Sequence, residues 1–313
     1  MPFHFNNETP VNQPVPRKDI QLPAVCMRRL IVIIFITPPF IHEFLCTLNN
    51  LLSFNPSFYP SNTNFFMITV ALYNLKGGVG KTASCVNFAY LAAMDGYKTL
   101  LWDIDPQGST TFYYKIKPKD AQGIKKLVSK DAKLESAIMS TNYENLEIIP
   151  ADASARSFDI MIEEMKGNKN RLKSILKQLE HEYDFVFIDC PPGLSALSEN
   201  IFSAADVVLM PIIPTTLSIR TYNMIKDYFK EKELDSSKMM CFFTMADLRK
   251  NMHNDIMEQL YKDKKFFQNY IPYLSDVEKM GIHRQPIEEF ARSSYAARCY
   301  HDLWTEIKEG VVE

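Results

Sequence analysis

The 313-residue sequence lacks the signatures of several common classes of protein. None of its six cysteines belongs to a C-x-x-C pair or has a histidine at zinc-ligand spacing, so we exclude a zinc site and expect reduced, mostly buried thiols. A formal net charge of −2 provides no protein-wide field that would attract nucleic acid. No internal repeat is present, which argues against a tandem architecture.

The first 66 residues lack glycine altogether, although they hold nine of the 18 prolines and nine of the 21 phenylalanines. Their apolar run, Leu30–Ile36, is much shorter than the roughly 20 residues that span a bilayer. We expect residues 1–66 to be a poorly ordered N-terminal extension, with a membrane anchor as the alternative. The interpretation that we favour is that translation begins at Met67.

The remainder, residues 67–313, is apolar enough for one large domain, since 46% of the chain is hydrophobic. Apolar runs predict strands, and longer periodic segments predict helices between them. The strands are expected at residues 67–73, 98–102, 146–149, 183–189, 206–213 and 239–244, and the helices at 83–94, 170–180, 218–233, 254–262 and 295–308. Such alternation predicts an α/β fold with a doubly wound, mainly parallel sheet and flanking helices.

Three of the ten glycines lie together in the segment LKGGVGKT, residues 75–82. Glycines let backbone N–H groups turn toward phosphate oxygens, and the helix that follows presents its positive end. Leu75 stands where the pattern G-x-x-x-x-G-K-[ST] has its first glycine. The order of strand, glycine loop and helix still predicts a phosphate loop, in which Lys81 reaches the β- and γ-phosphates and Thr82 binds Mg²⁺.

Carboxylates follow two of the predicted strands. Asp103 and Asp105 end the strand at 98–102, and because they are two apart in an extended chain they point the same way. One can help to hold a hydrated metal while the other orients an attacking water. On spacing alone, a simple turn with an Asx cap at residues 105–108 is almost as good an interpretation.

A third acid, Asp189, ends the strand at 183–189, as the Mg²⁺-side acid of a P-loop enzyme requires. We expect Asp189 to contact the metal through water. The segment that follows, CPPG at residues 190–193, predicts a stiff turn that can respond to the γ-phosphate, because proline restricts its conformations.

Three segments carry a specific resemblance: KGGVGKT at 76–82, WDIDPQG at 102–108 and FIDCPP at 187–192. From about Met67 to the C-terminus the chain resembles the ParA/MinD family of deviant Walker A ATPases, on its ParA (Soj-like) side. The resemblance implies an Mg²⁺-dependent ATPase that forms a sandwich homodimer when ATP is bound. In such a dimer Lys76, the extra lysine of the loop, reaches the phosphates of the other subunit.

The resemblance also assigns roles to residues. It implies that ATP is bound by Lys76, Gly77, Gly78, Val79, Gly80, Lys81, Thr82 and Ala83. It implies that Lys76, Lys81 and Asp105 are catalytic, with Asp105 orienting the water, and that Thr82, Asp103 and Asp189 serve the metal.

The partners implied by the resemblance are nonspecific DNA and a stimulating ParB-like protein, in a cytoplasmic, nucleoid-associated protein. Candidate DNA contacts are Arg249 and Lys250 in TMADLRK, residues 244–250, and further cations at Arg220, Arg284, Arg292 and Arg298. At residues 271–274 the chain reads IPYL, whereas the family often has I-P-R-N, and this weakens the case for DNA contacts at that loop. The acidic C-terminal end lacks the basic amphipathic helix of the MinD branch, so no membrane contact is expected.

The expected function is therefore an ATP-driven switch for partitioning plasmid or chromosomal DNA. One alternative is a ParA-like regulator that positions a protein complex instead of DNA. The other is a metabolic P-loop enzyme, such as an amidotransferase-type synthetase, which would turn over ATP without a partner.

Overall fold

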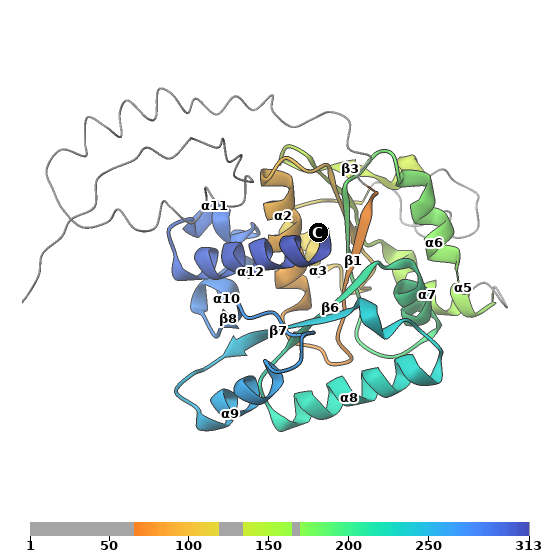
Figure 1. Cartoon of the computed structure of the whole chain (residues 1–313). Coiled ribbons are helices and arrows are strands. Elements are labelled where there is room, and N and C mark those ends of the chain that lie inside the picture. The colour runs from red at the N-terminus through yellow and green to blue at the C-terminus, as the bar shows by residue number, and fades with distance from the viewer. Residues whose placement is uncertain (1–65, 119–133, 165–169, 313) are drawn as a thin grey trace, which may run out of the picture. The chain divides into compact units, whose positions relative to one another are not determined.

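The computed structural model describes residues 66–118, 134–164 and 170–312, which all belong to one unit, Asn64–Glu313 (Figure 1). The predicted N-terminal extension, residues 1–66, lies outside the described residues apart from its last member, Phe66. The predictions made for that extension therefore stay predictions.

The described residues form an eight-stranded sheet in the order β3-β4-β2-β5-β1-β6-β7-β8. All neighbouring strands are parallel except β3 and β4, which pair antiparallel at one edge. The strands are β1 (Ile68–Leu72), β2 (Thr99–Asp103), β3 (Met139–Ser140), β4 (Leu146–Ile149), β5 (Phe185–Asp189), β6 (Val207–Ile212), β7 (Met239–Ala246) and β8 (Ile271–Pro272).

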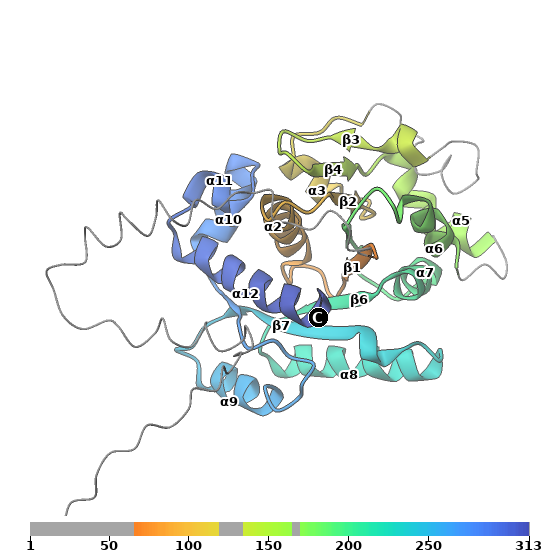
Figure 2. The ribbon, with the colours of Figure 1, turned by 45° about the horizontal axis from the view of Figure 1, so that its top comes forward.

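Helices cover both faces of the sheet (Figures 1 and 2). One face carries α2 (Lys81–Met94), α10 (Ser275–His283), α11 (Ile287–Ala291) and α12 (Tyr295–Val312). The other carries α5 (Phe158–Glu164), α6 (Arg171–Leu176), α7 (Ala196–Ala204), α8 (Thr216–Glu231) and α9 (Asn251–Leu260). A short helix, α3 (Ser109–Tyr113), follows β2.

Each central strand supplies two hydrophobic cores because alternate side chains point to opposite faces. In β5, Phe185 and Phe187 pack in the core beneath α2 and α12, whereas Val186 and Ile188 pack in the core beneath α7 and α8. All four are buried, which explains why this strand reads as a continuous apolar run. The predicted doubly wound α/β fold is confirmed.

The six predicted strands are all present, and the differences concern short elements and helix ends. Helix α2 begins at Lys81, two residues before the predicted start, and α9 begins at Asn251. The helices α3, α5, α7, α10 and α11 and the strands β3 and β8 were not predicted. They have nine residues or fewer, so each shows too few periods of an apolar pattern.

Parallel pairing brings the functional segments to one edge of the sheet. The register places Asp103 of β2 opposite Asp189 of β5, and Leu72 of β1 opposite the same Asp189. The glycine loop begins directly after β1, so both acids and the loop lie at the carboxyl ends of three adjacent strands. This edge is where open parallel sheets bind their ligands.

The indole of Trp304 on α12 anchors the core beneath α2. It is 1% exposed, its ring lies 5.5 Å from Phe185 and 5.9 Å from Phe187, and its Nε1 donates a 2.9 Å hydrogen bond to Asp95. We expect Trp304→Ala to lower the free energy of unfolding by about 3–5 kcal/mol. Urea denaturation measures this, with Leu217→Ala, at a 64% exposed site on α8, as a control expected to change it by less than about 0.5 kcal/mol.

Candidate functional site

The loop between β1 and α2 is shaped by its glycines and by one asparagine. Gly78 and Gly80 have φ angles of 73° and 84°, which residues with a Cβ rarely adopt. A Cβ on Gly80 would also lie 3.3 Å from Oγ1 of Thr244, so the loop and the end of β7 are in close contact. Asn74 holds the start of the loop: its Nδ2 donates to the Pro211 carbonyl at 2.8 Å, and its Oδ1 accepts from the Lys76 amide at 2.9 Å.

The two lysines of the loop lie in different surroundings. Lys81 is 6% exposed, and its Nζ donates to the carbonyl oxygen of Lys76 at 3.0 Å. Burial lowers the pKa of Lys81, and the charge of Asp189 partly offsets this. Lys76 is half-buried, and within the described part of the chain its ammonium makes no hydrogen bond or ion pair.

Asp103 and Asp189 form a pair of fully buried carboxyl groups. Each uses its Oδ2 in hydrogen bonds, whereas neither Oδ1 has a partner among the described residues. Burial, and then the charge of Asp189, raise the pKa of Asp103 to about 8. Burial raises the pKa of Asp189 to about 6, although hydrogen bonds from Thr110 and Thr82 and the charge of Lys81 act against the shift.

Helix α3 supplies two residues that the sequence reasoning missed. The hydroxyl of Thr110 donates to Asp189 Oδ2 at 2.8 Å, and the amide and hydroxyl of Thr111 donate to Asp103 Oδ2 at 2.8 and 2.7 Å. The Thr111 oxygen also accepts from the amide of Ala151, after β4. Consecutive threonines after a strand-end acid motif were the only signal, and such residues are common at helix starts for local reasons.

Asp105 lies in the turn between β2 and α3. Its Oδ1 accepts from the Gln107 amide at 2.9 Å, and its carbonyl accepts from the Gly108 amide at 2.9 Å. The Asx turn that the spacing left open is therefore present. Asp105 is also close enough for its charge to affect the pKa values of Asp189 and Lys81, so the turn places this carboxylate beside the pair.

The residues at this edge suit a magnesium ion held through phosphate oxygens and water. The Thr82 side chain is close enough to Asp189 to lower the pKa of that carboxyl, and the buried Oδ1 of Asp189 has no protein partner within the described ranges. Hydroxyl and carboxylate oxygens are the donors that Mg²⁺ prefers, usually with few protein ligands. The described residues include no cluster of three or more histidine, cysteine or acidic side chains that could enclose a metal by themselves.

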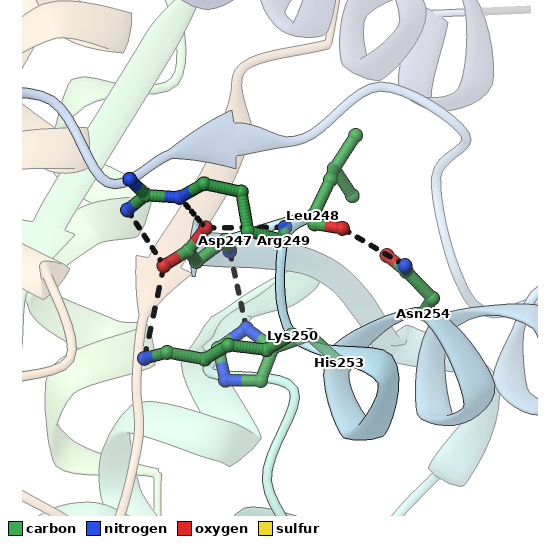
Figure 3. A network of polar contacts seen from close by, with 6 residues as sticks. All are labelled: Asp247, Leu248, Arg249, Lys250, His253 and Asn254. Carbon is green, nitrogen blue, oxygen red and sulfur yellow. Dashed lines mark hydrogen bonds and ion pairs between the residues drawn. The ribbon is translucent and has the colours of Figure 1, made fainter.

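The candidate DNA contacts Arg249 and Lys250 lie together in the loop before α9 (Figure 3). Asp247 binds both: Arg249 Nε and Nη2 donate to its two oxygens at 2.8 and 2.9 Å, and Lys250 Nζ lies 3.9 Å away. This pairing lowers the pKa of Asp247 to about 2. His253 accepts from the Asp247 amide and Asn254 donates to the Leu248 carbonyl, so α9 holds the loop.

The other candidate cations are spread over several helices. Arg284 lies 4.2 Å from the ring of Phe112 and donates to the Phe112 carbonyl, while Arg292 pairs with Glu288 and Arg298 lies over Tyr295. Arg220 is exposed on α8. Among the described residues, no helix has the length and apolar character needed to cross a bilayer.

Comparison with known proteins gives concordant results. The family model described as an AAA domain matches residues 67–239. The chain is 31% identical over 245 residues to the sporulation initiation inhibitor protein Soj of Bacillus subtilis, covering 76% of this chain and 97% of that protein. It is 30% identical over 247 residues to the chromosome-partitioning ATPase Soj of Treponema pallidum, covering 76% of this chain and 96% of that one.

Two solved structures show the same fold at lower identity. A putative plasmid partition protein of Borrelia burgdorferi bound to AMPPNP has a TM-score of 0.69 and 20% identity, covering 79% of this chain and 100% of that one. Cobyrinic acid a,c-diamide synthase of Mycobacterium smegmatis with ADP and magnesium has a TM-score of 0.64 and 23% identity, covering 76% and 93%.

The buried acid pair makes the ligand-free protein sensitive to pH. The folded-state pKa of Asp103, about 8, lies above the ordinary aspartate value of 3.8, so the folded state holds the proton more tightly and stability falls as pH rises between these values. From pH 6.5 to 8, above the pKa of Asp189, the free energy of unfolding should fall by up to about 1.4 kcal/mol per pH unit.

Asp103→Asn should flatten this pH dependence, because the amide keeps an acceptor for Thr111 and does not titrate. Urea denaturation in EDTA, without nucleotide, measures both proteins across that range. Equal slopes for the two proteins would contradict the assignment of the proton to Asp103.

Proposed function

The chain belongs to the ParA/Soj family of deviant Walker A ATPases, and on this premise we propose that it is a Mg²⁺-dependent ATP hydrolase that partitions plasmid or chromosomal DNA. The observation that carries the proposal is the pair of lysines in one phosphate loop. The Lys81 side chain is buried within the loop, whereas the Lys76 ammonium makes no hydrogen bond or ion pair to the described residues of its own chain.

In this proposal the loop binds the triphosphate of ATP. The amides of residues 76–83 surround the phosphates, and Lys81 exchanges its bond to the Lys76 carbonyl for phosphate oxygens. Burial strengthens the attraction, because Lys81 sits at a low-dielectric edge of the sheet. The loop thus neutralises charge that develops as the γ-phosphoryl group leaves.

Thr82 and Asp189 are the residues that would hold Mg²⁺, with Asp103 as a supporting acid. When bound, the ion would neutralise charge on the phosphate groups. Asp105 orients the attacking water, and its turn fixes where the carboxylate lies relative to Asp189. Hydrolysis therefore depends mainly on positioning, as in other phosphoryl-transfer sites.

The proposed active unit is a homodimer that forms on ATP binding. The ammonium of Lys76 makes no hydrogen bond or ion pair to the described residues of its own subunit, and it would contact phosphates of the opposite subunit. The dimer would bind nonspecific DNA through Arg249 and Lys250. It would therefore be found in the cytoplasm, associated with the nucleoid. A ParB-like protein would then stimulate hydrolysis.

The likeness to cobyrinic acid a,c-diamide synthase, at 23% identity, extends to the fold and does not favour the metabolic alternative. A hollow of about 510 Å³ is lined by residues such as Lys98 and Tyr183, which precede β2 and β5 and therefore lie at the opposite edge of the sheet from the phosphate loop. A cargo made of protein instead of DNA remains the alternative that shares the same ATPase. Retention on nonspecific DNA with and without ATP, over a salt series, separates the two cargoes.

Lys76→Ala should abolish hydrolysis and ATP-dependent dimerisation while leaving part of the nucleotide affinity, because Lys81 and the loop amides remain. ATP turnover, nucleotide binding and sedimentation with ATPγS measure these three properties. Lys177→Ala, an exposed lysine elsewhere, is the matched control.

A mixing experiment tests the cross-subunit role directly. Lys76→Ala and Asp105→Ala should each be inactive alone, but their mixture should recover activity, because one site of the heterodimer combines an intact Asp105 with the partner's Lys76. A mixture that stays inactive although heterodimers form would place the role of Lys76 within its own subunit.

Arg249→Ala should weaken DNA binding in ATP and reduce the slope of log affinity against log salt by about one, since one phosphate contact is lost. Asp247→Asn should have the opposite effect on affinity, because it removes the acid that pairs with both cations. Lys173→Ala, an exposed lysine on α6, is the control. Unchanged DNA binding in Arg249→Ala would remove this loop from the proposed interface.

A further inference from the structure

We propose that Thr110 is a positioning residue of the metal site. Its hydroxyl holds one oxygen of Asp189, so that the other oxygen faces the position beside Thr82 where Mg²⁺ would bind. Through the same bond, helix α3 and the Asp105 turn before it are tied to the metal-side acid. This inference rests on the proposed ATPase function and adds to it a residue and a coupling within the site.

The geometry of the pair supports this role. Thr110 Oγ1 lies 2.8 Å from Asp189 Oδ2, and both residues are 0% exposed. Asp189 Oδ1 is buried and has no partner among the described residues. A hydroxyl donates one hydrogen bond only, so Thr110 distinguishes the two oxygens of the carboxylate. Rotation of the carboxyl group would break a buried, charge-assisted bond, which is costly.

The hydroxyl of Thr110 forms its bond outside the local chain. Here its hydroxyl bonds a carboxylate 79 residues away in the sequence, on β5. Valine has the shape of threonine and could fill this buried position if packing were the only requirement. The hydroxyl is therefore explained by its bond to Asp189, the metal-side acid.

Helix α3 is held to the site at several points, and it connects Asp189 to the turn that contains Asp105. Thr111 holds Asp103 with its amide and hydroxyl, as Thr110 holds Asp189, and these two acids face each other in the register of β2 and β5. At the other end of α3, Arg284 donates to the Phe112 carbonyl. The Asp105 turn connects β2 to this fixed helix, so a shift of Asp189 is transmitted to the water-orienting carboxylate.

The test compares two pairs of variants that differ only in the hydroxyl. Valine matches threonine in shape, and alanine matches serine, so Thr110→Val is compared with the wild type and Thr110→Ala with Thr110→Ser. Thermal unfolding without ligand first establishes that each variant is folded. ATPγS binding is then measured in EDTA and over a Mg²⁺ series, and ATP hydrolysis is measured over the same series.

The proposal predicts that the variants without a hydroxyl need roughly ten- to a hundredfold more Mg²⁺ for half-maximal binding and hydrolysis, as is usual when a residue that orients a metal ligand is lost. Their ATPγS affinity in EDTA should equal that of the hydroxyl-bearing partner. Thr110→Ser should stay within about threefold of the wild type in its Mg²⁺ requirement, a small change compared with those losses.

An equal Mg²⁺ requirement with and without the hydroxyl would overturn the proposal. Equal loss of ATPγS affinity in EDTA and in Mg²⁺ would overturn it too, because a structural defect would then explain the effect. Measurement of the wild type distinguishes failure of the Thr110 proposal from failure of the proposed function. If the wild type binds no Mg²⁺-nucleotide, the ATPase assignment itself is wrong.

Discussion

The structure depends on one constraint, the side-by-side placement of two buried carboxyl groups at the ends of β2 and β5. Parallel pairing puts Asp103 opposite Asp189, where neither is solvated and each repels the other's charge. Such a pair persists only if protons, hydroxyl groups or cations compensate for it. Around it the protein provides Lys81, Thr82 and the two threonines of α3. The edge of the sheet that holds the proposed ATP site is built from these compensating groups.

The placement of this acid pair on a parallel sheet also explains which parts of the fold and of the site could be predicted from the sequence. The positions of the glycine loop and of the strand-end acids were predictable because each pairs a local pattern with a known position on a parallel sheet. The central strands were predictable too, since they are buried on both faces and read as apolar runs. Thr110 was not, because its partner Asp189 lies 79 residues away in the chain. Thr111 was not either: its partner Asp103 is only eight residues away, but the contact depends on how α3 packs against the end of β2, which no local pattern encodes.

The cationic loop illustrates a different limit. From the sequence, Arg249 and Lys250 were two adjacent candidate DNA contacts, and no pairing with Asp247 was predicted. In the structure that acid binds both, and α9 fixes the loop through His253 and Asn254 (Figure 3). The close approach of Thr244 to Gly80 brings the preceding end of β7 against the phosphate loop. The cationic loop and the proposed nucleotide site are thus connected by the short stretch of chain from Thr244 to Asp247.

The strand order has a consequence for how the protein is made. Strand β1, which leads into the phosphate loop, pairs with β5 and β6 and with no strand close to it in sequence. Of the described strands β1 leaves the ribosome first, yet both of its edges stay open until β5 has been made, and its second edge stays open until the chain has been extended beyond Val207. Its apolar side chains and unpaired backbone N–H and C=O groups are exposed during that interval, which favours association with other chains. Newly made copies of this protein should therefore depend on chaperones for longer than their size alone would suggest.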